Sequence, residues 1–357
     1  MYREGTKRLD SISIIVDEML LTISDADRRR NAYIHLYGVS NFASMLAHKR
    51  GLHAELAAIA GMLHDYYFYK TGISTFHAEN SAEAVRPILR NTGLFSKEEL
   101  RTILRSIFYH NNQMNQHGVY EETIKDAVML HHYFHNPKDE PFQSNRLQSL
   151  LLDLSIPIGT SVEQIAPTDT PSSVPTINRR QLWADFAEEH ASKGIWGMAG
   201  DQDYRDLCAH WPDSNIYVVL KDSWCAAFVY YCCRQAGLLL PIRYPNGVCR
   251  FAGVAAWLEW AQLPDIRCFH SGMEEDFTPS RGDIVIYEKL LSDDPHDHIG
   301  IVLSCDNDVL IVAEGNKDNK NQSAIVHRDR RKYVAGYIRV ANEYQYSFTG
   351  EYEPILN

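Results

Sequence analysis

The chain has 357 residues and a formal net charge of −11, with 45% hydrophobic and 23% charged residues. This composition is typical of globular proteins, and the length exceeds what one compact core usually holds, so we expect two domains. The acidic balance argues against a nucleic-acid duplex as a partner, because such binding needs a basic surface. A small phosphate ester is compatible with it, since a bound metal ion can supply local positive charge.

The first 24 residues lack the pattern of a secretory signal, because Asp17 and Glu18 break the apolar run. No stretch reaches the uninterrupted apolar length of a membrane helix, so we expect no membrane partner. The seven cysteines, an odd number without a C-x-x-C pair, fit a reducing compartment better than a disulfide framework or a structural zinc site. We therefore expect a protein that is cytoplasmic as synthesised, with release or dedicated delivery outside the cell as the alternative.

The N-terminal half is predicted to be all helical. Apolar residues recur there at helical spacing, and no strand pattern is present. Ser96 with Glu99 has the pattern of a capping box, and Pro87 is expected to interrupt its helix. The expected helices cover residues 31–51, 53–67, 81–93, 96–111 and 120–136.

The C-terminal half has a different pattern. Helical periodicity over 181–194 and after Trp224 gives way, from residue 282 on, to short β-type runs. Helices followed by consecutive strands indicate an α+β domain with an antiparallel sheet. A stretch rich in Pro, Ser and Thr, residues 165–178, separates the halves. The expected divisions are a helical domain 1–155, a linker 156–178, an α+β domain 179–345 and a tail 346–357.

A candidate metal site lies in the helical half. His64 and Asp65 are adjacent near the end of a predicted helix, where an imidazole and a carboxylate can both reach one divalent ion. A single dipeptide of this kind also arises by chance on a surface. His35 lies in the preceding helix, and Asp126 precedes an apolar stripe in a later one. A carboxylate buried there needs a partner, and a metal ion is one such partner.

The order of these residues resembles that of the HD-domain metal-dependent phosphohydrolases, over about residues 30–137. The resemblance implies a helical bundle that hydrolyses a small phosphate ester or a nucleotide with one or two divalent ions. The tight turn and lysine that usually follow the His-Asp pair are not kept, since Lys70 comes later. The implied ligands are His35, His64, Asp65 and Asp126 for the first ion, and His77 and His110 for the second.

The remaining histidines of this half are interpreted as surface or packing residues. His132 and His135 lie three apart on one predicted helix, a spacing that would suit a metal. Without further ligands at that spacing, a solvated helix face is the better interpretation. His48, His53, His117 and His131 are likewise interpreted as surface or packing residues.

Three cysteines fall together in the C-terminal half, and they could form a metal site, a disulfide, a buried face or a catalytic thiol. Asp222 or Ser223 is a suitable N-cap, which places Cys225 in the first turn of a helix, where the dipole favours a thiolate. Cys232 and Cys233 follow two turns deeper and are expected to be buried apolar groups.

A base and an orienting group for this thiol follow downstream. His298 opens a predicted strand, with His296 as a nearby competitor for the role of base. Glu314 and Asn316 are separated by one residue in a later predicted strand, so both are expected on one face, where either could orient the imidazole.

The runs WCAAFV, PSRGDIV, DHIGIV, EGN and GYIRV resemble the CHAP family of cysteine amidases and peptidases, papain-like in layout, over about residues 179–341. The resemblance implies Cys225 as the nucleophile and His298 as the base, with Glu314 as the orienting group and Asn316 as the second candidate. It implies a peptide or peptidoglycan amide as the substrate.

Together these patterns predict a bifunctional hydrolase. The alternative is a nucleotide-sensing or interaction protein, in which the helical domain binds a ligand without turnover and regulates the other domain.

Overall fold

The computed structural model describes residues 6–135, 145–156, 178–213, 215–243, 250–293 and 295–348. Contacts divide the chain into two compact units, Met1–Pro175 and Thr176–Asn357. The linker expected over 156–178 lies outside the described residues except at its two ends, and the tail expected over 346–357 lies outside them from residue 349 on. No helix among the described residues has the length and apolar character needed to span a bilayer.

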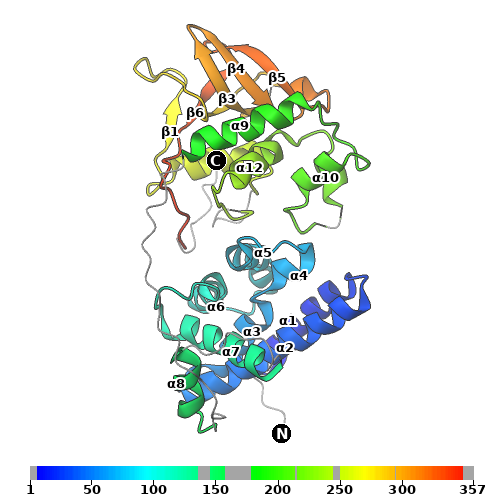
Figure 1. Ribbon diagram of the computed structural model, residues 1–357, viewed down its shortest axis with the longest axis vertical. Coiled ribbons are helices and arrows are strands. Elements are labelled where there is room, and N and C mark those ends of the chain that lie inside the picture. The colour runs from blue at the N-terminus through cyan, green and yellow to red at the C-terminus, as the bar shows by residue number, and fades with distance from the viewer. Residues whose placement is uncertain are drawn as a thin grey trace, which may run out of the picture. The chain divides into compact units, whose positions relative to one another are not determined.

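The first unit is helical throughout its described residues, as predicted (Figure 1). The capping box at Ser96 and Glu99 is present at the start of its sixth helix. Pro87 does not interrupt its helix, contrary to the prediction, and lies inside a continuous element. The helices are α1 (Thr6–Leu21), α2 (Ala26–Lys49), α3 (Ala54–Leu63), α4 (Tyr66–Thr71), α5 (His77–Thr92), α6 (Lys97–Tyr109), α7 (Val119–His135) and α8 (Asn145–Asp153).

Helix α3 forms the centre of this unit. Each of its residues from Leu56 to Leu63 is buried, so it is apolar on all sides and must be enclosed by other helices. Helices α1, α2, α6 and α7 all contact it. The expected single helix over 53–67 is instead two, because α3 ends at Leu63 and α4 begins at Tyr66. His64 and Asp65 occupy the junction, which directs their side chains toward the surrounding helices.

The second unit is an α+β domain with one antiparallel sheet, which confirms the predicted fold class. The sheet order is β1-β6-β2-β3-β4-β5, and helices α9 and α12 pack against its strands (Figure 1). The helices are α9 (Arg179–Ser192), α10 (Gln202–Cys208), α11 (Ile216–Val219), α12 (Cys225–Gln235) and α13 (Val254–Gln262). The strands are β1 (Phe269–Ser271), β2 (Ile284–Tyr287), β3 (His298–Asp306), β4 (Val309–Glu314), β5 (Ala324–Asp329) and β6 (Val334–Ile338), with the short 3-10 helix η1 (Lys317–Asn319) after β4.

The central strands β2 and β3 provide the rigid part of the domain. All four residues of β2 are buried, and so are the first six of β3. Strands β2 to β6 fall within the β-type runs that were predicted from residue 282 on, whereas the three-residue edge strand β1 was not predicted. Such a short strand has too few residues to show an alternating pattern.

Candidate active sites

The helical unit brings five predicted metal ligands together from separate elements. His35 lies in α2, His64 and Asp65 occupy the α3–α4 junction, His77 is the first residue of α5, and His110 caps the C-terminus of α6. Four of these residues lie at or beside helix ends, so their side chains can turn into one shared space between the helices.

Asp65 lies between two pairs of imidazoles. Its Oδ2 atom is 3.4 Å from Nε2 of both His35 and His64, and its Oδ1 atom is 3.4 Å from Nε2 of both His77 and His110. The Nε2 atoms of His35 and His64 are 3.0 Å apart. Each trio places its ligand atoms within 4.8 Å of one another. Asp65 is therefore positioned to join two adjacent sites.

Three of the histidines are held with Nε2 facing this space. The Nδ1 atoms of His64, His77 and His110 each lie 2.7 Å from a backbone carbonyl oxygen. A carbonyl only accepts, so Nδ1 carries the proton and donates it, which leaves the Nε2 lone pair for a ligand. This arrangement is the one that metal-binding imidazoles usually have.

The charge states also suit a cation. Burial lowers the pKa of His64 well below its usual value and also lowers the pKa of His77, which favours the neutral, ligating form. Burial raises the pKa of Asp65, but the surrounding histidines, His64 foremost, outweigh it and hold the pKa well below its usual value. Asp65 Oδ1 is buried and accepts no hydrogen bond from the described residues. The donor set and this unsatisfied oxygen fit a divalent ion.

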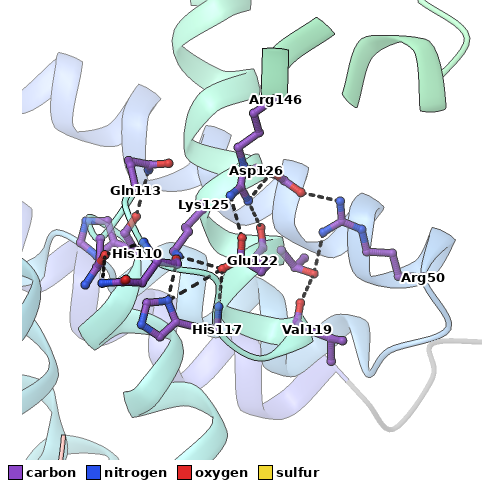
Figure 2. A network of polar contacts seen from close by, with 12 residues as sticks. Arg50, His110, Gln113, His117, Val119, Glu122, Lys125, Asp126 and Arg146 are labelled. Atoms are coloured by element: carbon purple, nitrogen blue, oxygen red, sulfur yellow. Dashed lines mark hydrogen bonds and ion pairs between the residues drawn. The ribbon is translucent and has the colours of Figure 1, made fainter. Parts of the chain in front are cut away.

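Asp126, the fourth predicted ligand of the first ion, does not join this cluster among the described residues. Its Oδ2 accepts a hydrogen bond of 2.5 Å from Arg50, and its Oδ1 accepts one of 2.7 Å from Arg146 (Figure 2). Two guanidinium groups therefore meet the need of a partly buried carboxylate for a partner. Figure 2 shows the same network continuing through Glu122 to the buried Lys125, which ties α7 to α8.

Two further histidines, both in α7, lie beside this cluster. The rings of His131 and His132 contact the ring of His35, with centroids 4.8 and 5.4 Å away. His131 is buried, in agreement with its interpretation as a packing residue, whereas His132, which was expected on a solvated face, is half-buried.

The second unit places Cys225 as the first residue of α12, in the helical turn that was predicted. Trp224, rather than Asp222 or Ser223, occupies the N-cap position, and no side chain caps the helix. The Trp224 ring is buried and donates its Nε1–H to Asn321, which makes it a packing residue. Cys225 therefore lies in the first turn, where the backbone N–H groups of a helix have no intrahelical acceptors.

Strands β3 and β4 position the base and its partner. His298 is the first residue of β3, Glu314 is the last residue of β4, and the strands are hydrogen-bonded neighbours. A Cβ atom at Gly300 would lie only 3.0 Å from Glu314 Cγ, so the glycine makes room for this side chain to cross β3. The sheet therefore holds both groups in one place.

His298 links the thiol to the carboxylate. Its Nε2 lies 3.0 Å from Glu314 Oε2, and both side chains are fully buried. Burial lowers the pKa of His298, but hydrogen bonding with Cys225 and the charges of Cys225 and Glu314 outweigh it and raise the pKa to about 10. Nδ1 is buried and has no hydrogen-bond partner among the described residues, so it is the ring nitrogen left available to the thiol. The order of the groups is that of a nucleophilic thiol, a base and an orienting carboxylate.

Arg328 extends this arrangement and was not predicted. From β5 its guanidinium donates to both oxygens of Glu314, at 3.0 and 2.6 Å, and to Asp318 at 2.9 Å. Burial raises the pKa of Glu314, but its bonds with His298 and Arg328 lower it below its usual value. Only the pairing of β4 with β5 brings Arg328 here, so no local pattern in the sequence could indicate it.

Asn316, the second candidate for orienting the imidazole, directs its side chain to groups other than the imidazole. Strand β4 ends at Glu314, and Asn316 adopts a left-handed conformation at φ 52°, so the alternation of a strand does not extend to it. Its amide donates to the backbone carbonyl of Asp222, and its Oδ1 accepts from the backbone N–H of Asn321. Asn316 therefore secures the loop after β4 to the segment before α12.

A cavity of about 610 Å³ opens beside the thiol and carries both charge signs. Asp297 accepts backbone N–H bonds from the loop at 290–292 and thereby shapes one wall. His296, the competitor for the base, lines the cavity and lies outside the Cys225–His298–Glu314 arrangement. The other lining residues include Asp222, Ser223, Arg250, Val254 and Asn319.

The neighbouring cysteines are structural, as predicted. Cys232 and Cys233 are buried in α12, and burial raises the pKa of both thiols far above the usual range. The same cause raises the pKa of Cys208 and Cys268 to about 12. Cys249 lies outside the described residues.

The two sites belong to two kinds of domain. One is a helical domain with histidines clustered around one aspartate, and the other is an α+β domain with a Cys-His-Glu arrangement. An HD-domain family model matches residues 32–152, and a CHAP-domain family model matches residues 217–316. The chain therefore carries an HD domain followed by a CHAP domain, a fusion of two hydrolase families. Searches of curated proteins and of solved structures gave no match.

Proposed function

We propose that the CHAP domain is a cysteine amidase or endopeptidase that acts on a peptide amide, including that of peptidoglycan. The observation that carries this proposal is the buried contact of His298 with both Cys225 and Glu314. The cavity beside Cys225 is large enough for a peptide segment, and its mixed charges suit a chain that carries amine and carboxylate groups.

The reaction follows from the positions of these groups. The Cys225 thiolate attacks the amide carbonyl carbon, and the backbone N–H groups at the start of α12 face the developing oxyanion. His298 donates its proton to the departing amine as the C–N bond breaks, which leaves a thioester. His298 then takes a proton from water, the resulting hydroxide displaces the thiolate, and a carboxylic acid is released. Glu314 keeps the imidazole in the required orientation throughout.

We further propose that the HD domain hydrolyses a small phosphate ester or a nucleotide with one or two divalent ions. His35, His64 and Asp65 would hold one ion, and Asp65, His77 and His110 a second. A bound divalent ion supplies Lewis acidity toward a phosphoryl oxygen and a water activated at neutral pH. Burial favours the neutral form of His64 and His77, which present Nε2 toward this space, and the ionised Asp65 supplies the single negative charge shared by both trios.

The amidase proposal is tested by incubating the full chain with purified peptidoglycan and with peptide amides, and identifying the products by mass spectrometry. Cys225→Ala should abolish release, whereas Cys232→Ala, a change of another cysteine on the same helix, should retain it. Full activity of Cys225→Ala on the same substrate would refute the assignment. No release from either substrate class by the wild type would refute the substrate class.

The phosphohydrolase proposal is tested with a chromogenic phosphodiester and a nucleotide panel in the presence of Mn²⁺ or Co²⁺. Asp65→Ala should remove all metal-dependent turnover, because both trios lose their shared carboxylate. Nucleotide binding without product, together with an altered amidase rate, would instead identify the HD domain as a sensor of the ligand.

A further inference from the structure

We propose that His132 of α7 is the fourth ligand of the first metal site, the role that the sequence assigned to Asp126. This inference rests on the proposed metal dependence of the HD domain. The ligands proposed for the first site come from α2 and from the junction between α3 and α4. Helix α7 would be the third part of the chain to contribute a ligand to this site.

The geometry around His35 supports this role. The His132 ring centroid lies 5.4 Å from that of His35. Ring pairs within the two ligand trios are separated by similar distances: 4.9 Å for His35–His64 and 5.2 Å for His77–His110. His132 is not among the described residues whose ligand atoms lie within 4.8 Å of one another, so its ring would turn about its side-chain torsions to reach an ion beside His35.

His131 is also near His35, but its ring has a packing role. A Cβ atom at Gly38 would overlap the His131 ring, so this ring fills the space that the glycine leaves between α2 and α7. It also stacks on His135 with centroids 4.8 Å apart and an interplanar angle of 28°. His132 is half-buried, and its ring contacts that of His35.

Asp126 lies on the same helix but cannot take this position. Residues 126 and 132 are not separated by a whole number of turns, since an α-helix has 3.6 residues per turn, so the two side chains leave α7 in different directions. Asp126 points toward Arg50 and Arg146, and His132 toward His35 (Figure 2 for Asp126).

The assignment has a consequence for metal selectivity. With His132 included, the two sites have five imidazoles and a single carboxylate, Asp65. Imidazole ligands suit Zn²⁺, Fe²⁺, Co²⁺ and Ni²⁺, whereas Mg²⁺ prefers oxygen ligands. The HD domain should therefore bind these transition metals in preference to Mg²⁺.

The test uses the full chain, stripped of metal by chelation and titrated with Co²⁺, with binding followed by calorimetry and by the visible absorption of Co²⁺. His132→Ala should weaken binding at one site at least tenfold and change the spectrum, with circular dichroism unchanged. His135→Ala, an exposed histidine of the same helix, and Asp126→Asn should bind Co²⁺ like the wild type. His132→Asp, which restores a ligand, should bind Co²⁺ again and gain affinity for Mg²⁺.

Two results would overturn the proposal. One is wild-type Co²⁺ binding and an unchanged spectrum in His132→Ala. The other is a loss of one site in Asp126→Asn or His131→Ala while His132→Ala retains it. If His132→Ala does not fold, His132→Asp provides the test. A Co²⁺ spectrum and a Mg²⁺ affinity equal to those of the wild type would then refute the role of His132. Turnover of phosphate esters is measured separately, so Co²⁺ binding without turnover refutes the proposed activity and leaves the ligand assignment standing.

Discussion

The Nε2 atom of His298 lies 3.0 Å from Oε2 of Glu314, with both side chains fully buried. The same carboxylate accepts two hydrogen bonds from Arg328. A buried carboxylate with two cationic partners is held in position and kept ionised. The imidazole that it binds is therefore fixed in orientation and stabilised in its protonated form.

The first prediction concerns the pKa of His298. This pKa is about 10 in the folded protein, and the thiol of Cys225 is the first of the groups that raise it. In Cys225→Ala the pKa should fall, because burial then opposes protonation with only Glu314 against it. Titration of the histidine resonances by NMR in the two proteins measures the difference. Equal pKa values of His298 in the two proteins would contradict an interaction between the imidazole and the thiol of Cys225.

The raised pKa also sets the direction of a pH effect. Because the folded pKa of His298 exceeds its unfolded value, the imidazolium contributes stability that is fully present below about pH 6.5. This contribution is lost as the pH rises through about 10. The free energy of unfolding of the CHAP domain should show this loss in the wild type, and a smaller one in Cys225→Ala.

The second prediction concerns Arg328 as a positioning residue. Arg328→Ala removes both bonds to Glu314 and should lower kcat/KM by about 10- to 100-fold, since an oriented general acid contributes about 100-fold or more. The pH–rate profile should shift as well, because Glu314 loses a cationic partner. Arg328→Lys should recover part of the activity. Arg331→Ala, which removes an exposed surface ion pair with Asp308, serves as the control.

A purely structural role for Arg328 predicts something different. In that case Arg328→Ala would lower the melting temperature without changing the pH–rate profile of the protein that remains folded. Such a result would refute the positioning role.

The third prediction concerns metal stoichiometry. Asp65 contacts both pairs of imidazoles, so Asp65→Asn should reduce binding at both sites. His77→Ala should remove only the second site, because His77 belongs to one trio. Elemental analysis after equilibration with Co²⁺ gives the number of ions per chain. Equal losses in the two variants would show that Asp65 does not join the sites.

The fourth prediction concerns thiol reactivity. An alkylating agent at neutral pH should modify Cys225 in the folded protein well before Cys232 or Cys233, whose pKa values burial raises far above the usual range. Peptide mapping by mass spectrometry at successive times separates the three. Equal modification rates would refute the assignment of one reactive and two structural thiols.

Much of the fold was predictable from the sequence, because its signals are local. The apolar periodicity of the helices and the alternating runs after residue 282 need no knowledge of distant contacts. Cys225 at a helix start and His298 at a strand start were predictable for the same reason. The errors at Pro87 and at the end of β4 also have local causes, since a helix can continue through proline and a strand can end two residues earlier than its pattern suggests.

By itself, the sequence determined two domains, their classes and most of the residues at each site, because these depend on composition, spacing and local periodicity. Only the tertiary structure decided which of the candidate side chains come together. Asp126 and His132 lie on one helix, and the packing of α7 sends the first to two arginines and the second toward His35. Arg328 reaches Glu314 only because β5 pairs with β4. A side chain's partner is set by the packing of elements that are distant in sequence, and a local sequence pattern does not encode that packing.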